Sequence, residues 1–251
     1  MTERLRGPHA GLNAVLFDFD RTLLDLFTER AEAALAAAVT AYYRSELGLG
    51  EPRARMAVAR VLAEQAGRPY RLWAEVHQAL AGVDQELADR VGREVGSILT
   101  EHECGAAGGR TAPAALPGVK ATLAWLEDAG LALAVVAGNS LAAVRTALHR
   151  AGILSRFDVI VARTPELDMA ELAPSRYGVE RALGQLGIAP GDAVLVGDSP
   201  ADMRAGLAAK VYTVGVASHP AQAEQLREAG AAAVIADMTG LKALVVQHLV
   251  A

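Results

Sequence analysis

The sequence predicts an α/β protein with an open parallel sheet and an all-helical segment inserted after the first strand. Short apolar runs, mostly rich in valine, leucine or isoleucine, recur along the chain. Such runs are typical of strands that are buried on both faces of a parallel sheet. From residue 117 onward they alternate with helical segments, as right-handed crossover connections require. Between residues 24 and 104 no such run occurs, and the composition is helical.

The expected strands and helices follow one another in a regular order. The strands are expected at 14–17, 131–137, 157–162, 193–197, 211–216 and 233–236. After residue 117, the helices between them are expected at 118–129, 140–151, 175–187, 200–209 and 220–229. Glycines stand where helices commonly end, at Gly130, Gly152, Gly187 and Gly230.

The inserted segment is expected to form four helices, near 26–47, 53–66, 69–81 and 84–103. Alanine, leucine, glutamate and arginine dominate it, and glycine and proline separate the helices. The stretch from Gly105 to Pro117 is rich in glycine and proline, which predicts a linker back to the sheet. We therefore expect an α/β core of residues 1–23 and 105–251 and a helical cap of residues 24–104.

The composition excludes several classes of protein. The chain has 251 residues, of which 52% are hydrophobic and 21% charged, so it can bury a sizeable core. The net charge is −5 and no stretch is strongly basic, so we expect no nucleic-acid partner. The single cysteine, Cys104, excludes an intramolecular disulfide and a cysteine-based zinc cluster. No apolar run suits a signal peptide or a membrane span, so a cytoplasmic protein without a membrane partner is expected. The oligomeric state is left open.

Carboxylates directly follow two of the predicted strands. Asp18 and Asp20 come after the strand at 14–17, and Asp198 and Asp202 come after the strand at 193–197. Either pair alone is compatible with a turn or a helix cap. The carboxyl ends of parallel strands, however, meet at the crevice where open sheets bind ligands. Carboxylates that converge there repel one another unless a cation is bound, and oxygen ligands of this kind suit Mg²⁺. The sequence therefore predicts a magnesium site at this edge of the sheet.

These segments resemble motifs of the haloacid dehalogenase (HAD) superfamily of hydrolases. Asp-Phe-Asp-Arg-Thr at 18–22 is similar to the first motif, and Gly-Asp-Ser-Pro-Ala-Asp at 197–202 is similar to the fourth. Further segments resemble the phosphoglycolate-phosphatase-like branch, at 116–119, 137–140, 163–168 and 211–216. The helical segment after the first motif resembles the C1-type cap of that branch. The resemblance implies a Rossmann-like core with an inserted helical cap.

The resemblance also implies a phosphatase and assigns roles to the carboxylates. Asp18 would be the nucleophile that forms an aspartyl-phosphate, and Asp20 would protonate the leaving group and then deprotonate water. Mg²⁺ would be held by Asp18, the main-chain carbonyl of Asp20, and Asp198, with support from Asp202. An acid at position 20 favours phosphoryl chemistry over dehalogenation. The implied partner is a small phosphorylated substrate.

Four residues are expected to bind the substrate phosphate. Thr22 would also fix the loop after the first strand. The main-chain amides of Gly138 and Asn139 would face the phosphate at a helix N-terminus. Arg176 would contribute positive charge, as would Arg163 if it reached the site.

Two positions depart from the family pattern. Ala137 stands where the family has serine or threonine, and Ala173 stands where it has lysine before a proline. The only lysines lie elsewhere in the sequence, at Lys120, Lys210 and Lys242. Losing one electrostatic contact of this kind typically costs about 10²–10³ in rate. Two functions therefore stay open: a Mg²⁺-dependent phosphatase with weakened activity, or a catalytically impaired protein of this fold that binds a phosphorylated ligand or a protein partner.

Overall fold

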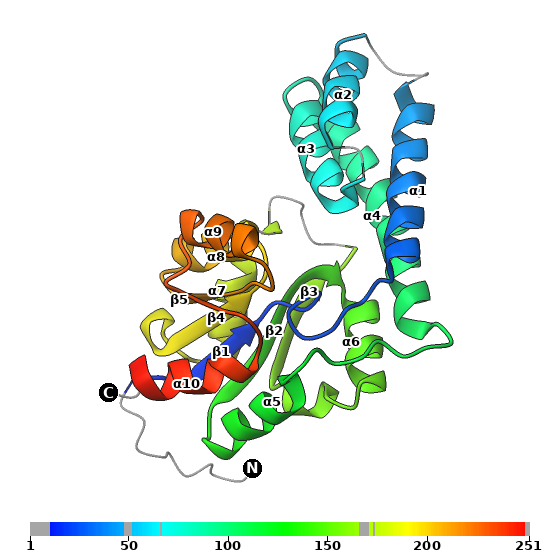
Figure 1. Cartoon of the computed structure of the whole chain (residues 1–251). Coiled ribbons are helices and arrows are strands. Elements are labelled where there is room, and N and C mark those ends of the chain that lie inside the picture. The colour runs from blue at the N-terminus through cyan, green and yellow to red at the C-terminus, as the bar shows by residue number, and fades with distance from the viewer. Residues whose placement is uncertain (1–10, 48–51, 66, 166–170, 173, 249–251) are drawn as a thin grey trace.

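The predicted fold class is confirmed by the computed structural model, which describes residues 11–47, 52–65, 67–165, 171–172 and 174–248 (Figure 1). Six parallel strands form one sheet in the order β3-β2-β1-β4-β5-β6. They are β1 (Ala14–Phe17), β2 (Ala132–Ser140), β3 (Val159–Arg163), β4 (Ala193–Gly197), β5 (Tyr212–Val216) and β6 (Ala233–Ile235). The order reverses at β1, so β1 and its neighbours β2 and β4 end at the crevice expected for a ligand.

Helices cover both faces of the sheet because its central strands are apolar on both sides. On β1, Val15 and Phe17 belong to the core shared with α5 (Val119–Asp128), α6 (Leu141–Arg150) and α10 (Thr239–His248). Ala14 and Leu16 face the opposite way and pack with α7 (Tyr177–Leu186) and α8 (Pro200–Ala208). The remaining helix of the core, α9 (Pro220–Glu228), packs against α8, β5 and β6. This arrangement is the doubly covered parallel sheet that the apolar runs predict.

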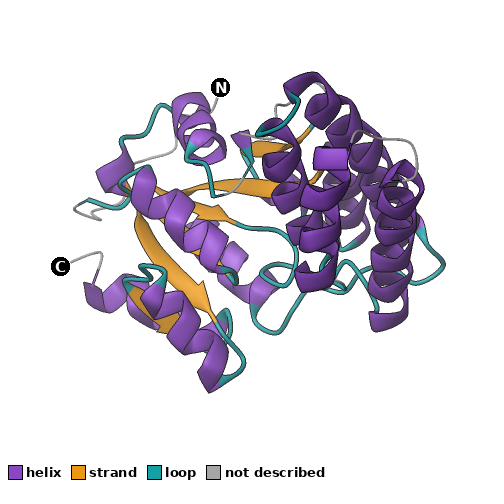
Figure 2. Cartoon of the chain, turned by 90° about the horizontal axis from the view of Figure 1, so that it is seen from above, coloured by secondary structure: helices purple, strands orange, loops and turns teal. Residues whose placement is uncertain are grey.

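The helical insertion is defined here as α1 (Glu29–Leu47), α2 (Pro52–Gln65), α3 (Pro69–Ala81) and α4 (Gln85–Gly108). It stands beside the sheet, at the end of the molecule where the carboxyl end of β1 lies (Figures 1 and 2). Its own apolar core includes Val39, Trp73, Val76 and Leu99. None of the helices in the described ranges is long and apolar enough to cross a membrane, the 24-residue α4 included.

Two predicted boundaries near the insertion are wrong. The linker predicted from Gly105 begins only after Gly108, because α4 continues through Gly105 and Gly108. This last turn is held by tertiary contacts: Ala107 is buried in the core of the sheet, and Arg150 Nη1 donates to its carbonyl at 2.6 Å. Such packing outweighs the low helix propensity of glycine. The second error is β2, which was predicted to end at residue 137 and extends to Ser140. The division at residue 104 stays a prediction.

Lys210 adopts a left-handed backbone conformation that favours glycine, and its replacement by glycine is expected to stabilise the protein. Its φ is 61° at the end of α8, where Val211 N–H donates to Gly206 and Lys210 N–H donates to Leu207. The gain of Lys210→Gly is expected to be about 0.5–1 kcal/mol, measured by urea denaturation. Lys210→Ala keeps a Cβ and should gain nothing; an equal gain in both variants would contradict a backbone cause.

Candidate active site

Three carboxylates converge at the carboxyl ends of β1 and β4. Each of Asp18, Asp198 and Asp202 offers one oxygen, and these oxygens lie within 4.8 Å of one another. The strands bring them together because β1 and β4 pair in parallel, with Phe17 opposite Val196. Asp18 N–H also donates to the Val196 carbonyl at 2.8 Å, which continues the pairing into the site. In the described residues this is the one acidic cluster suited to a metal ion.

The beginning of α8 fixes the orientation of Asp202. Ser199 is the N-cap, and its hydroxyl and main-chain N–H both donate to Asp202 Oδ2, at 2.6 and 3.0 Å. This capping box satisfies donors at the start of the helix. Gly197, at the end of β4, is required by the close approach of Asp202, since a Cβ there would lie 2.6 Å from the Asp202 Cβ. The tight turn therefore places Asp202 beside Asp198.

Burial raises the pKa values of the three carboxyl groups, and repulsion by neighbouring carboxylates adds to the rise at Asp18 and Asp198. The pKa of Asp18 lies well above its ordinary value, first because of burial and then because of Asp202 and Asp198. Burial, followed by the charge of Asp202, raises the pKa of Asp198 to about 7. Burial also raises the pKa of Asp202, despite its bonds from Ser199. A site of three half-buried acids at this spacing fits a divalent cation, because positive charge offsets the cost of ionising them together.

A divalent cation is therefore expected to stabilise the protein at neutral pH and much less in acid. Without metal, the raised pKa values mean that the folded state binds more protons than the unfolded state, so stability falls as pH rises from about 4 to 7. Mg²⁺ at a hundredfold excess over Kd should restore about 2.7 kcal/mol at pH 7.5, or roughly 5–10 °C in Tm. Thermal unfolding with MgCl₂ or EDTA at pH 5 and 7.5 measures this. Asp202→Asn should reduce the gain, and an equal gain at both pH values would contradict the assignment.

Asp20 lies on the same loop but outside the three-carboxylate cluster. Its Oδ1 accepts a hydrogen bond from Leu26 N–H at 2.8 Å, which turns the side chain toward the start of the insertion. Burial raises the pKa of Asp20 to about 6, although the bond from Leu26 and the charge of Arg21 oppose the rise. A carboxyl group with a pKa in this range can donate and accept a proton near neutral pH.

The loop after β1 also carries Arg21 and Thr22. Arg21 has a φ of 61°, and its guanidinium forms an ion pair with Glu32 of α1 at 2.5 Å. This pair connects the loop to the insertion. Thr22 is fully buried, and its hydroxyl has no hydrogen-bond partner among the residues that the structure describes. Both residues line a cavity of about 620 Å³ together with Asp198.

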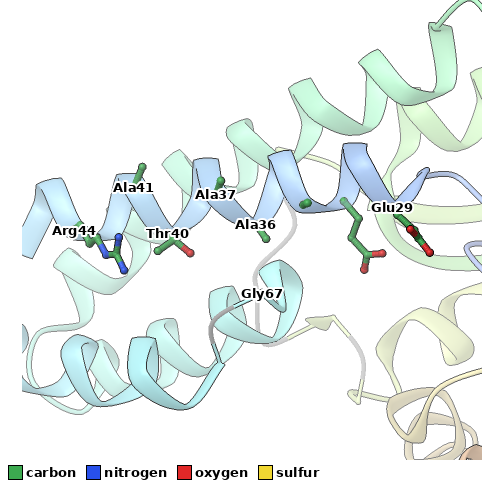
Figure 3. A pocket seen from close by; sticks show the side chains of 9 residues that line it. Glu29, Ala36, Ala37, Thr40, Ala41, Arg44 and Gly67 are labelled. Atoms are coloured by element: carbon green, nitrogen blue, oxygen red, sulfur yellow. The ribbon is translucent and has the colours of Figure 1, made fainter.

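A second hollow, of about 550 Å³, runs along α1 (Figure 3). Small side chains on this helix, among them Ala36, Ala37 and Ala41, leave the space open opposite Gly67. Glu29 lies at one end of the lining and Arg44 lies at the other, and Glu32 is also part of the lining. Glu32 forms an ion pair with Arg21, and this pair connects the lining of the hollow to the loop that carries Asp20.

The predicted phosphate-binding segment lies at the end of β2. The pairing of β2 with β3 shifts there: Ala137 is opposite Ala162 and Ser140 is opposite Arg163, so Gly138 and Asn139 bulge out of the ladder. Gly138 is exposed, whereas the Asn139 side chain is buried. The Asn139 Nδ2 group donates to the Tyr70 hydroxyl of α3 at 3.0 Å, so this side chain is held by the insertion.

Ala137 is 8% exposed and belongs to the core shared with α5, α6 and α10. A cavity of about 40 Å³ is bordered by Ala137, Gly138, Ser175 and Asp202, among other residues. Most of its lining belongs to the opposite face of the sheet, which packs against α7 and α8, and it is large enough for water. The second departure, Ala173, lies outside the described residues.

The haloacid dehalogenase-like hydrolase family matches residues 12–210, which include β1, the insertion, the bulge of β2 and the acidic cluster. The chain belongs to this family.

Named relatives of this HAD chain are phosphatases. It is 26% identical to phosphoglycolate phosphatase of Synechococcus elongatus over 82% of this chain and 84% of that protein. It is 30% identical to hexitol phosphatase A of Escherichia coli over 64% of this chain and 73% of that protein. Among solved structures, a predicted phosphatase from Clostridium acetobutylicum has the same fold, with a TM-score of 0.64 at 20% identity over 95% of this chain and all of that one.

The two arginines considered as replacements for the family lysine, Arg163 and Arg176, are each paired with a glutamate. Arg163 is buried and pairs with Glu103 of α4, whereas Arg176 is 62% exposed and pairs with Glu180. The three lysines are all exposed: Lys120 on α5, Lys242 on α10, and Lys210 at the end of α8 far from Asp202. The phosphate role of Arg176 stays a prediction.

Sequence analysis missed Glu103 and Tyr70, which contact the bulge. A glutamate and a tyrosine on helices carry no local signal of such contacts. Only the packing of α3 and α4 beside the end of β2 brings them to Asn139 and Ser140.

Proposed function

We propose that this chain is a Mg²⁺-dependent phosphatase that hydrolyses a small phosphorylated metabolite through an aspartyl-phosphate on Asp18. The observation that carries the proposal is the convergence of Asp18, Asp198 and Asp202, with Asp20 two residues beyond Asp18. The phosphatase names of the relatives, with phosphoglycolate and hexitol phosphates as their named substrates, support the substrate class.

In the first step the Asp18 carboxylate forms a bond to phosphorus while the ester P–O bond breaks. Asp20 donates its proton to the leaving alkoxide, which its raised pKa allows. In the second step Asp20 takes a proton from water, whose oxygen attacks phosphorus and releases inorganic phosphate from Asp18. The main-chain amides of Gly138 and Asn139, and the Thr22 hydroxyl, are proposed to hold the phosphate oxygens.

Asp18, Asp198 and the main-chain carbonyl of Asp20 are the proposed ligands of Mg²⁺, with Asp202 in support. The ion would neutralise the repulsion between the carboxylates and the phosphate.

The experiment is release of inorganic phosphate from p-nitrophenyl phosphate and from a panel of phosphorylated small acids, sugars and sugar alcohols, with Mg²⁺ or EDTA. Hydrolysis that requires Mg²⁺ is expected. A folded protein that releases phosphate from none of these compounds would overturn the proposal.

Two observations favour the second candidate, a catalytically impaired protein that binds a phosphorylated ligand or a protein partner. Ala137 carries no hydroxyl, and Arg163 and Arg176 are each engaged by a glutamate. Binding of inorganic phosphate, followed by calorimetry, without turnover of any compound in the panel would support this candidate. Efficient turnover of one of them would exclude it.

A further inference from the structure

A buried ion pair joins the insertion to the end of β3. Arg163 is the last residue of β3, and Glu103 lies in the last third of α4. Their side chains are 7% and 0% exposed, and the Arg163 guanidinium lies over the Trp73 ring, 5.3 Å from its centre. Gly96 of α4 has no side chain to separate Arg163 from the helix backbone. The pair is therefore enclosed by α3, α4 and the edge of the sheet.

All the donors of Arg163 are used within the protein. A guanidinium has five N–H groups. Nε donates to the Gly138 carbonyl, Nη1 donates to Gly96 and Thr100, and Nη2 donates to both oxygens of Glu103, at 2.9–3.1 Å. Arg163 thus has no N–H left for a substrate phosphate and does not take the place of the family lysine.

The partners of the pair are the residues of the β2 bulge. Arg163 holds the Gly138 carbonyl, and Glu103 Oε2 accepts from Ser140 N–H at 2.7 Å. Between them, the Asn139 amide group donates to the Tyr70 hydroxyl, which in turn donates to Glu103 Oε1 at 2.8 Å. Every residue of the bulge is therefore bonded to this network, and the bulge carries the amides proposed to bind phosphate.

We propose that Glu103 and Arg163 are positioning residues that fix the Gly138–Asn139 bulge, so that its main-chain amides are aimed at the substrate phosphate. This inference rests on the proposed function. Because the two charges cancel, the pair orients the bulge without placing a net charge beside the phosphate. Glu103 belongs to the insertion, so the insertion contributes to phosphate binding through the backbone of the core.

Glu103→Gln is the first test, because it keeps the size of the side chain and removes its charge. The probes are inorganic phosphate, as ligand in calorimetry and as product inhibitor, and p-nitrophenyl phosphate as substrate, all with Mg²⁺. We expect the Kd and Ki of phosphate to rise about 10-fold to 100-fold and kcat/KM to fall similarly, at temperatures where the variant is fully folded. Glu127→Gln is the matched control, since Glu127 pairs with Arg156 between α5 and the turn before β3, away from the bulge.

A purely structural pair would lower Tm and leave phosphate binding unchanged in the folded variant, and that result would overturn the proposal. If Glu103→Gln does not fold, the double variant Glu103→Gln with Arg163→Met removes both charges and leaves none unpaired. It should show the same loss of phosphate affinity, and an affinity within twofold of the wild type would overturn the inference alone. A wild-type protein that neither hydrolyses the substrate nor binds phosphate would instead overturn the proposed function, and this inference with it.

Discussion

Replacing Asp18 with asparagine is expected to lower kcat for p-nitrophenyl phosphate by about 10⁴-fold or more, because an amide cannot form the bond to phosphorus. The residue is well placed for this role: it follows β1 directly, and its main-chain N–H is held by Val196. Steady-state kinetics at saturating Mg²⁺ measure the effect. An acid-stable phosphoenzyme should be detectable by mass spectrometry in the wild type and absent in the variant.

Unfolding does not explain such a loss, because Asp18→Asn should stabilise the metal-free protein. Burial and the charges of Asp202 and Asp198 raise the pKa of Asp18, so its ionised form costs stability at neutral pH, and asparagine removes that cost. The control is Asp128→Asn. Asp128 is the exposed last residue of α5, just before β2 begins, so this variant should keep wild-type activity. Activity of Asp18→Asn within tenfold of the wild type would exclude Asp18 as the nucleophile.

Ala137→Thr is expected to raise kcat/KM about 100-fold. Threonine adds a hydroxyl at the end of β2, directly before the bulge that carries the amides proposed to bind phosphate. A positioned donor of this kind is typically worth about 10²–10³ in rate. The measurement is kcat/KM with p-nitrophenyl phosphate, together with the Ki of inorganic phosphate.

Ala137→Val is the matched control, because valine has the shape of threonine without the hydroxyl. It should fill the same space and leave kcat/KM unchanged. An equal gain in both variants would attribute the effect to packing, and no gain in the threonine variant would show that position 137 does not limit the rate.

Much of the fold could be predicted because its signals are local. A run such as Ala193–Gly197 is apolar at every position, which suits a strand covered on both faces, and Ser199 with Asp202 is a recognisable start of a helix. The predicted end of β2 was wrong because Gly138 and Asn139 were expected at the N-terminus of a helix that begins at residue 140. Their bonds to Arg163 and Glu103 extend the strand, and these partners are far away in the sequence.

The sequence by itself determined the strands and helices along the chain, the inserted helices and the carboxylates at the strand ends, since apolar runs and helical periodicity are local features. It also identified Ala137 as a departure and the scarcity of lysine. Only the tertiary structure decided what the charged groups do. Arg163 was a candidate for the missing cation, yet its donors are all occupied by α4 and Gly138. Whether a guanidinium can reach a phosphate depends on its other hydrogen-bond partners, and these lie 25 to 67 residues away in the chain.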